Sequence, residues 1–474
     1  MLRSWKFEVQ LDKQANKAIY LQIADAIIRD IQSGRLKTGE ALPGSRYLAQ
    51  FLQVNRNTVV EALQVLIAEG WLVPKERKGT FVAGNIPVRA RTKNDRPQNF
   101  GAKELLEKPF HIQFDDGHPN AKIAPIAELA RAYRQIFSLK TKWQLMSYEG
   151  NALGDMAFRT EMAQMLNHQR GMQVREQNLC ITRGSQMAMY LAAQCLFKNG
   201  DEVLVENPGY KPAWKAFEHA GATLLPVGVD QEGLVTAEVL QYLKSRKKIK
   251  AVYVTPHHQY PTTVTLSLKR RLELIRLSNE YGFTIIEDDY DNEFHFGYRP
   301  VLPLSSFPEL RNYIYIGTMS KVVSPILRIG YLTSSDDMLI EKVGQLRKVI
   351  DVNGDSIMEQ AVLQLIKDGA IKRHIKKATH YYKSKKDFTA SLLKKHLGNK
   401  ATYHIPDGGL AFWIAMKQPM DWEKLSKKMF NKGIKITNPD AYGLDYAANG
   451  LRLGYGALTE KELEEGILAL SSCL

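Results

Sequence analysis

A single lysine stands out in the segment YIYIGTMSKVVSPILRIGYL, residues 313–332, because it directly follows an apolar run that ends in Gly-Thr-Met-Ser. This residue is Lys321, and Arg328 follows it seven residues later. A lysine amine is a nucleophile that can be exchanged for a substrate amine. Lys321 is therefore a candidate for covalent chemistry, against the alternative of an ordinary surface lysine in a loop.

Three aspartates follow another apolar run, in the segment IIEDDYDNEF at residues 285–294. Asp288, Asp289 and Asp291 could each hold a protonated nitrogen, cap a loop or bind a metal ion. No histidine is spaced to turn this run into a metal site. From the residues alone, all three remain candidates for an electrostatic role.

The segment TRGSQMAM, residues 182–189, contains a pattern that favours anion binding. It places Gly184, Ser185 and Gln186 where a predicted strand turns into a helix. Backbone N–H groups and the helix dipole would face an anion at such a turn. A Gly-Ser-Gln triplet is a weak signal by itself, so its meaning depends on the rest of the chain.

The bulk composition is that of a folded chain with a basic excess. The length of 474 residues exceeds one ordinary core, so two or three domains are expected. A hydrophobic share of 44% and a charged share of 24% exclude wholesale disorder, and the net charge of +15 suits a polyanionic partner such as nucleic acid. Cys180, Cys195 and Cys473 have neither metal-ligand spacing nor a paired framework, which indicates a reducing compartment. Without a signal peptide or a membrane-spanning run, a cytoplasmic protein is expected.

The elements that must position these residues begin with a compact unit over residues 1–83. Apolar spacing predicts three helices followed by a β-hairpin, the arrangement of a winged helix-turn-helix. Asn55 is expected to cap the third helix, and Gly34 to end the first. The side chains expected to face the core are Ile23, Ile27, Ile31, Leu48, Phe51, Leu52, Val59, Leu63 and Leu66.

The rest of the chain changes character twice. Residues 84–109 are polar, basic and punctuated by proline, which is typical of a linker. From residue 110, short apolar runs alternate with helical stretches, which predicts an α/β domain with a mainly parallel sheet. From about residue 351 to 474, a long basic helical stretch and further short strands predict a smaller α+β subdomain.

The segment from Tyr20 to Val82 resembles the GntR-type winged helix over its whole length, with the motif LPGSRYLAQFLQVNRNTVVEALQVLIAEGWLVPKERKGTFV. The resemblance implies that the third helix enters the major groove of double-stranded DNA, where Arg56 and Asn57 meet base edges. The chain departs from the family at Gln53, where glycine is usual and a left-handed backbone would cost about 1 kcal/mol. The positions assigned to DNA binding are Arg46, Arg56, Asn57, Thr58, Lys75, Arg77, Lys78, Gly79 and Thr80.

Residues 110–474 resemble the fold type I aminotransferases that use pyridoxal 5'-phosphate, with a mainly parallel seven-stranded sheet. The resemblance implies that Lys321 forms a Schiff base with the cofactor aldehyde, and that Asp288 rather than its neighbours keeps the pyridine nitrogen protonated. Tyr290 would bind the ring hydroxyl, and Tyr210 would stack on the ring. The other cofactor-binding positions implied are Gly184, Ser185, Gln186, Gln259, Thr318, Ser320 and Arg328.

Three further features follow from the same resemblance. The segment HQYPTT, residues 258–263, matches the aminotransferase branch fused to a GntR head, but Thr263 replaces a glycine and puts the turn geometry in doubt. Tyr148 lies where the family places a cofactor-binding tyrosine that reaches the phosphate of a neighbouring subunit, which implies a homodimer. Arg452 aligns with the arginine that clamps the carboxylate of an amino acid effector or substrate.

The N-terminal unit (residues 1–83, the head) and the aminotransferase-like region (residues 110–474, the body) together resemble the MocR-type regulators. The resemblance implies a transcriptional regulator that binds DNA, holds pyridoxal phosphate at Lys321 and senses an amino acid or amine through an external aldimine, without physiological turnover. Two alternatives stay open. The chain could be a working aminotransferase with an accessory DNA-binding head, or pyridoxal phosphate itself could be the signal.

Overall fold

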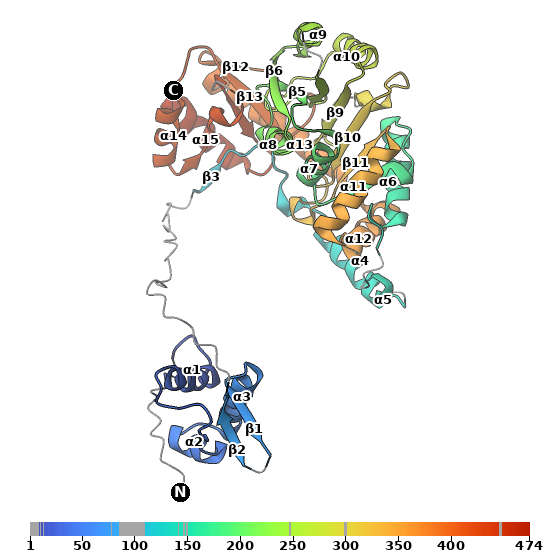
Figure 1. Ribbon diagram of the computed structural model, residues 1–474. Coiled ribbons are helices and arrows are strands. Elements are labelled where there is room, and N and C mark those ends of the chain that lie inside the picture. The colour runs from blue at the N-terminus through green and yellow to red at the C-terminus, as the bar shows by residue number, and fades with distance from the viewer. Residues whose placement is uncertain are drawn as a thin grey trace. The chain divides into compact units, whose positions relative to one another are not determined.

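The computed structural model describes residues 9, 11–12, 14–76, 78–84, 110–140, 142–145, 147, 150–245, 248–297, 301–444 and 448–474. The chain divides into two compact units, Met1–Leu105 and Leu106–Leu474 (Figure 1). The predicted linker lies outside the described residues except for Gly84. No described helix is both long and apolar enough to cross a membrane.

The N-terminal unit is a winged helix-turn-helix. Its elements are α1 (Ile19–Gln32), α2 (Ser45–Leu52), α3 (Arg56–Ala68) and an antiparallel hairpin of β1 (Leu72–Lys75) and β2 (Gly79–Val82). The turn after α2 is tight because Gln53 adopts a left-handed φ of 52°, the conformation expected from the motif. Asn55 then caps α3 by accepting a hydrogen bond from the backbone N–H of Asn57 at 2.9 Å.

The core of this unit follows the predicted spacing with one exception. Buried side chains confirm the pattern in α1 and α3: Ile23, Ile27, Ile31, Val59, Leu63 and Leu66. Phe51 was expected inside, but 53% of it is exposed. The inward face of the short α2 is filled by Leu48 and Ala49. Phe51 lies one turn after Tyr47 on the outer face, where their rings stack with centroids 6.3 Å apart.

The second unit is built around a sheet with the strand order β4-β11-β10-β9-β8-β5-β6-β7. The strands are β4 (Leu179–Thr182), β5 (Glu202–Asn207), β6 (Thr223–Asp230), β7 (Gly233–Leu234), β8 (Ile249–Val254), β9 (Thr284–Asp289), β10 (Tyr313–Thr318) and β11 (Gly330–Ser334). β11 is antiparallel to both neighbours, whereas β10, β9, β8, β5 and β6 are successively parallel. The sheet has eight strands instead of seven because the two-residue β7 folds back along β6.

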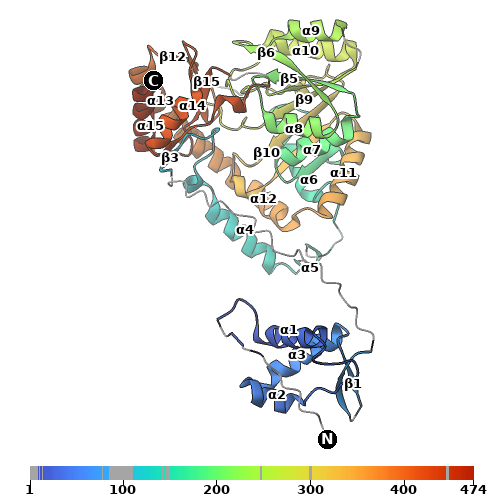
Figure 2. The ribbon, with the colours of Figure 1, turned by 60° about the vertical axis from the view of Figure 1, so that its left-hand side comes forward.

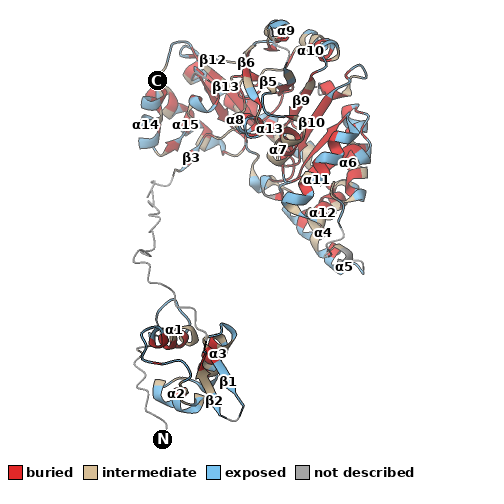
Figure 3. Cartoon of the chain, viewed as in Figure 1, coloured by how far each residue is buried: buried red, intermediate tan, exposed pale blue. Residues whose placement is uncertain are grey.

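Helices cover both faces of this sheet, which is therefore the middle of three layers (Figure 2). One face packs against α7 (Ser185–Leu196), α8 (Lys211–His219) and α11 (Asp337–Asp351). The other core contains α4 (Ile126–Ser138), α6 (Met156–Arg170), α9 (Thr236–Ser245), α10 (Leu268–Tyr281) and α12 (Ser356–Lys367), and the short α5 is Lys142–Leu145. Burial on both faces explains why β10 has six buried residues in a row. Figure 3 shows the strands buried and the outer helix faces exposed.

A smaller lobe adjoins this large lobe. It contains the antiparallel β12 (Ala401–Tyr403), β13 (Ala411–Met416) and β15 (Gly450–Gly454), the parallel pair β3 (Ile112–Gln113) and β14 (Ile434–Lys435), and the helices α13 (Ala370–Leu397), α14 (Trp422–Asn431) and α15 (Glu460–Cys473). The predicted start at about residue 351 is too early. α12 and the first turn of α13 belong to the large-lobe core, whereas the small-lobe core takes α13 from Ala378 onward and also Ile112 and Phe114. One uninterrupted helix joins both cores, so the sequence carries no break at the boundary.

Candidate functional site

A cavity of about 240 Å³ lies at the carboxyl ends of the parallel strands in the large lobe. The chain immediately after β5, β8, β9 and β10 contributes to its lining, the position where open α/β sheets bind ligands. Nine of the residues predicted from the sequence line it: Ser185, Gln186, Tyr210, Asp288, Tyr290, Thr318, Ser320, Lys321 and Arg328.

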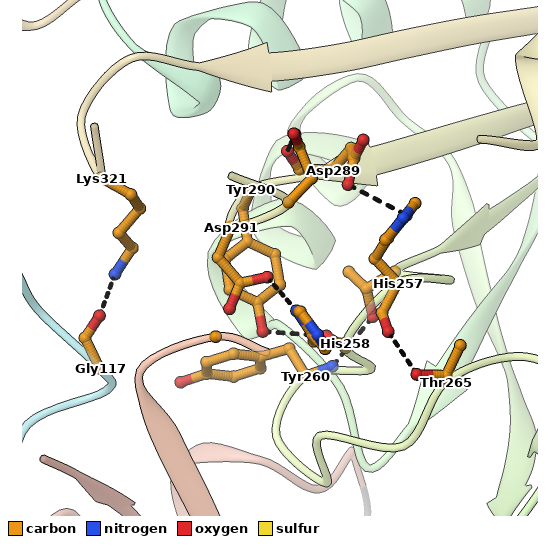
Figure 4. Close-up of polar contacts among 12 residues, drawn as sticks. Gly117, His257, His258, Tyr260, Thr265, Asp289, Tyr290, Asp291 and Lys321 are labelled. Carbon is orange, nitrogen blue, oxygen red and sulfur yellow. Dashed lines mark hydrogen bonds and ion pairs between the residues drawn. The ribbon is translucent and has the colours of Figure 1, made fainter. Parts of the chain in front are cut away.

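Lys321 lies three residues beyond β10, as the apolar run predicted. Its Nζ donates a hydrogen bond to the backbone carbonyl oxygen of Gly117 at 2.6 Å (Figure 4). Burial lowers the pKa of this amine. Its neutral, nucleophilic form is therefore easier to reach than that of a surface lysine.

The three aspartates have different surroundings. Asp288 faces the cavity, and burial raises its pKa to about 7. Its Oδ2 accepts a hydrogen bond from the Tyr253 hydroxyl at 2.9 Å, while its buried Oδ1 has no partner. Asp289 points to the opposite face, where Arg170 binds it at 2.5 Å. Asp291 pairs with His258 Nδ1 at 2.8 Å (Figure 4), so of the three only Asp288 offers the cavity a free carboxylate oxygen.

The start of α7 forms one wall of the cavity together with Arg328. Ser185 opens the helix, so its first backbone N–H groups have no partner within the helix. Gly184 precedes it with a φ of 82°, and a Cβ there would lie 3.0 Å from the Arg328 guanidinium. Arg328 itself has a φ of 53° and donates from Nη2 to the carbonyl oxygen of Arg183 at 2.9 Å. A strained arginine beside free N–H groups makes a cradle for an anion.

Tyrosines form the other walls, and Gln259 does not take part. Tyr210 and Tyr260 meet edge to face with ring centroids 5.0 Å apart, and both line the cavity. The Gln259 amide nitrogen instead donates to the carbonyl oxygens of Pro208 at 2.9 Å and of Tyr260 at 2.6 Å. Its side chain makes its contacts inside the turn and does not line the cavity, so its role as a cofactor-binding residue stays a prediction. The turn itself keeps a glycine-like path, with Thr263 at a φ of 64°.

Arg452 lies on β15 of the small lobe and is only 1% exposed. Its Nη1 donates to the carbonyl oxygen of Pro261 at 2.9 Å, its Nη2 to the Tyr290 hydroxyl at 3.1 Å, and its Nε to the carbonyl oxygen of Asp116 at 3.2 Å. It does not line the cavity but contacts Tyr290, which does. A guanidinium has five N–H donors, so two remain for a carboxylate.

The predicted DNA-contacting residues of the N-terminal unit lie on its surface. The side chains of Arg46 on α2 and of Arg56 and Asn57 at the start of α3 are exposed, and Thr58 is half-buried. On the hairpin, Lys75, Lys78 and Gly79 are exposed and Thr80 is half-buried, whereas Arg77 lies outside the described residues.

Comparison with known proteins identifies both units. Residues 121–470 match the family model described as aminotransferase class I and II, which is well over half of the chain. The chain belongs to the aminotransferase class I and II family. Residues 19–82 match the model described as bacterial regulatory proteins, gntR family.

Relatives of this aminotransferase-family chain fall into two kinds. The probable rhizopine catabolism regulatory protein MocR of Rhizobium meliloti is 26% identical over 480 residues, which cover 98% of this chain and 95% of that protein. Aromatic-amino-acid aminotransferase 1 of Thermococcus litoralis is 26% identical over 376 residues, which cover 78% of this chain and 89% of that protein. Kynurenine aminotransferase of Pyrococcus horikoshii, solved in complex with PMP, has a TM-score of 0.72 at 26% identity and covers 78% of this chain and 92% of that one. The chain therefore has the domain arrangement of MocR-like regulators, a GntR-type head fused to an aminotransferase-like body.

Two features of the cavity fit pyridoxal 5'-phosphate, the cofactor typical of this aminotransferase family. The buried, unpartnered Asp288 Oδ1 needs a donor, and a protonated ring nitrogen would supply one. The absence of a side chain at Gly184 leaves the Arg328 guanidinium open beside the start of α7, where a phosphate would be held. The donor set therefore suits an anionic ring compound that carries a protonated nitrogen.

The raised pKa of Asp288 gives this aminotransferase-like domain a measurable pH dependence in its cofactor-free form. The folded carboxyl holds its proton up to about pH 7, whereas the unfolded one releases it near pH 4, so stability is lost as pH rises between these values. Relative to Asp288→Asn, which does not ionise, the wild type should lose up to about 1.4 kcal/mol per pH unit over this window. Unfolding midpoints at pH 5 and pH 8 measure this, and parallel behaviour of the two proteins would contradict it.

Sequence reasoning missed five residues that line the cavity: Asp116, His118, Thr255, Tyr260 and Pro325. Asp116 is the most informative, because its Oδ1 is buried without a partner. It precedes Lys321 by more than 200 residues, and nothing in the local pattern FDDGHP connects the two. Tyr148 lies outside the described residues.

Proposed function

We propose that the chain is a transcription regulator that holds pyridoxal 5'-phosphate at Lys321 and changes its DNA binding in response to an amino acid or amine. One observation carries the proposal. A cavity with a buried lysine of lowered pKa and an unpartnered aspartate occurs in the same chain as a recognition helix whose first residues, Arg56 and Asn57, are exposed.

Each side chain of the cavity has a part in holding the cofactor. Pyridoxal phosphate supplies an aldehyde that condenses with amines and a ring that withdraws electrons. Lys321 would provide the amine, and Asp288 would keep a proton on the ring nitrogen. Ser185 and Arg328 would bind the phosphate, and Tyr210 would pack on the ring. Gly184, Gln186, Thr318 and Ser320 complete the phosphate side of this proposal.

The effector would be recognised where the lobes meet. Arg452 belongs to the small lobe, but Pro261 and Tyr290, to which it donates, belong to the large lobe. A carboxylate that takes the two remaining donors of Arg452 would add a contact at this junction and favour one lobe arrangement over another. Such a ligand shifts the population only by its differential affinity for the two states. We extend the proposal to a homodimer, with Tyr148 reaching the partner's phosphate, that acts in the cytoplasm on two DNA half-sites.

A working aminotransferase is the second candidate, because the cavity combines Lys321 with the free Asp288 oxygen that such chemistry requires. The two functions differ in the fate of the bound amine. A regulator should hold the amine without releasing an oxo acid. An enzyme should release one and be regenerated by another oxo acid over many cycles, which a coupled assay would measure.

The test is DNA binding by the full-length protein and its Arg56→Ala variant, with an operator selected from random-sequence DNA. Alanine preserves α3, so the loss should come from base contacts and weaken binding by roughly 5- to 150-fold, about 1–3 kcal/mol. The matched control is Arg29→Ala, since Arg29 is exposed on α1 outside the predicted DNA-contacting set. Equal binding by both variants would show that the head does not read DNA through α3.

A further inference from the structure

Positive charge in the body is concentrated on α13. Nine lysine or arginine residues and one aspartate lie within its 28 residues, so this helix carries a net charge of +8, compared with +15 for the whole chain. Neither the cavity nor the DNA-binding head uses these residues. This clustering of positive charge on α13 therefore needs a separate explanation.

The exposed charges of α13 lie on one side of the helix. At about 100° per residue, all seven exposed basic residues fall within a sector of about 140°. We call them the α13 stripe: Lys372, Arg373, Lys376, Lys377, Lys383, Lys394 and Lys395. The opposite side of the helix is buried and packs in the two lobe cores. The stripe is therefore a directed surface and not a scatter of charge around the helix.

The stripe differs from an ordinary solvated helix face in its lack of ion pairs. On α10, Arg276 pairs with Glu280 at 2.5 Å, and on α14, Lys427 pairs with Glu423 at 2.6 Å. Among the described residues, no stripe side chain makes an ion pair. The only exposed acid in the same sector is Asp387, which lies 3.3 Å from the Lys386 ammonium. Seven uncompensated cations on one face repel one another unless a polyanion lies against them.

We propose that the α13 stripe is a second DNA-binding surface, which contacts phosphates beside the sequence read by the head. From Lys372 to Lys395 the helix rises about 35 Å, which matches about ten base pairs of duplex. Lysines on flexible stems suit such contacts, because phosphate binding requires charge and not a fixed base pattern. The inference goes beyond the proposed function, which places DNA binding in the head alone.

Covalent connection limits how far the stripe can lie from the DNA once the head is bound. The chain from residue 84 to residue 110 can span at most roughly 90 Å, even if fully extended. A body held within this distance meets the flanking duplex at a high effective concentration, so weak phosphate contacts can add measurable affinity. The contacts should be independent of sequence and should weaken with salt.

The experiment uses full-length protein and a fluorescent duplex of random sequence, with anisotropy titrations between about 50 and 200 mM salt. One variant carries Lys372→Gln, Arg373→Gln, Lys376→Gln and Lys377→Gln. The matched control removes four exposed lysines scattered over the large lobe, Lys198→Gln, Lys215→Gln, Lys250→Gln and Lys269→Gln. The salt slope of the stripe variant should fall by about 2–4, since each lost phosphate contact contributes about 0.9, and its affinity should fall at least tenfold. The control should keep a slope within about 1 of the wild type.

Equal losses of salt slope and affinity in both variants would show that net charge alone causes the effect and would contradict the proposal. An unchanged salt slope in the stripe variant would also overturn it. A second variant guards against misfolding of the first. Lys383→Gln, Lys394→Gln and Lys395→Gln lie on later turns and should lower the slope by about 2–3. The Arg56→Ala variant tests DNA reading by the head independently of the α13 stripe. Its result can confirm the function of the head even if the stripe variants bind DNA like the wild type.

Discussion

Replacing Lys321 with alanine is expected to abolish the visible absorption band of the lysine-bound cofactor and to raise its apparent Kd at least 100-fold, about 3 kcal/mol. Lys321 is the one lysine that lines the cavity among the described residues, so no neighbour can replace its amine. Contacts from Asp288 and Arg328 would remain and leave weak, non-covalent retention. The measurement is an absorption spectrum of protein loaded with pyridoxal phosphate and then dialysed.

Lys342→Ala is the control for this prediction, because Lys342 is exposed on α11, away from the cavity. It should keep the wild-type spectrum. A band that survives Lys321→Ala would remove the cofactor assignment and leave only the DNA-binding head. Thermal unfolding of the unloaded proteins checks that the fold is intact.

Replacing Arg452 with lysine should raise the concentration of amino acid needed for half-maximal response by about 100-fold or more. Lysine keeps the positive charge but lacks the planar fork that binds a carboxylate through two parallel hydrogen bonds. Disrupting a buried charge pair typically costs 3–5 kcal/mol, so a hundredfold shift is a conservative expectation. Both the cofactor spectrum and DNA binding serve as readouts.

An internal control comes from the ligand. Amines without a carboxylate do not need Arg452, so their half-maximal concentrations should stay within about threefold of the wild type. If the half-maximal concentrations of amino acids and of simple amines rise equally, Arg452 acts by stabilising the fold and not by binding the carboxylate. If pyridoxal phosphate itself is the signal, Arg452→Lys leaves the response unchanged.

The residues that could be predicted from the sequence are those set by local chain geometry. Lys321 and Asp288 each follow an apolar strand, and a strand end in a parallel sheet fixes where the next side chains lie. The choice among Asp288, Asp289 and Asp291 needed the family resemblance, since alternation alone does not say which face holds the cavity. Gln53 kept the left-handed turn that its position requires.

The remaining features depend on long-range packing. Asp116 lies three residues after β3, which pairs with β14, a contact between segments more than 300 residues apart. Gln259 has the right polarity for a ligand, but the folded turn consumes its amide and leaves Tyr260 to line the wall. Phe51 was placed inside by its apolar character, yet the short α2 has no inward position left for it.

α13 is one continuous helix that connects the two lobes, so a rotation of one lobe would move its far end. Its first turn is fixed in the large-lobe core and the rest in the small-lobe core, over a length of about 40 Å. A lobe rotation of about 10° around its anchored end would displace the far end by roughly 7 Å, about two phosphate steps of 3.4 Å along the DNA axis. A small shift at Arg452 would thus be magnified at Lys394 and Lys395, enough to move these charges from one phosphate to another.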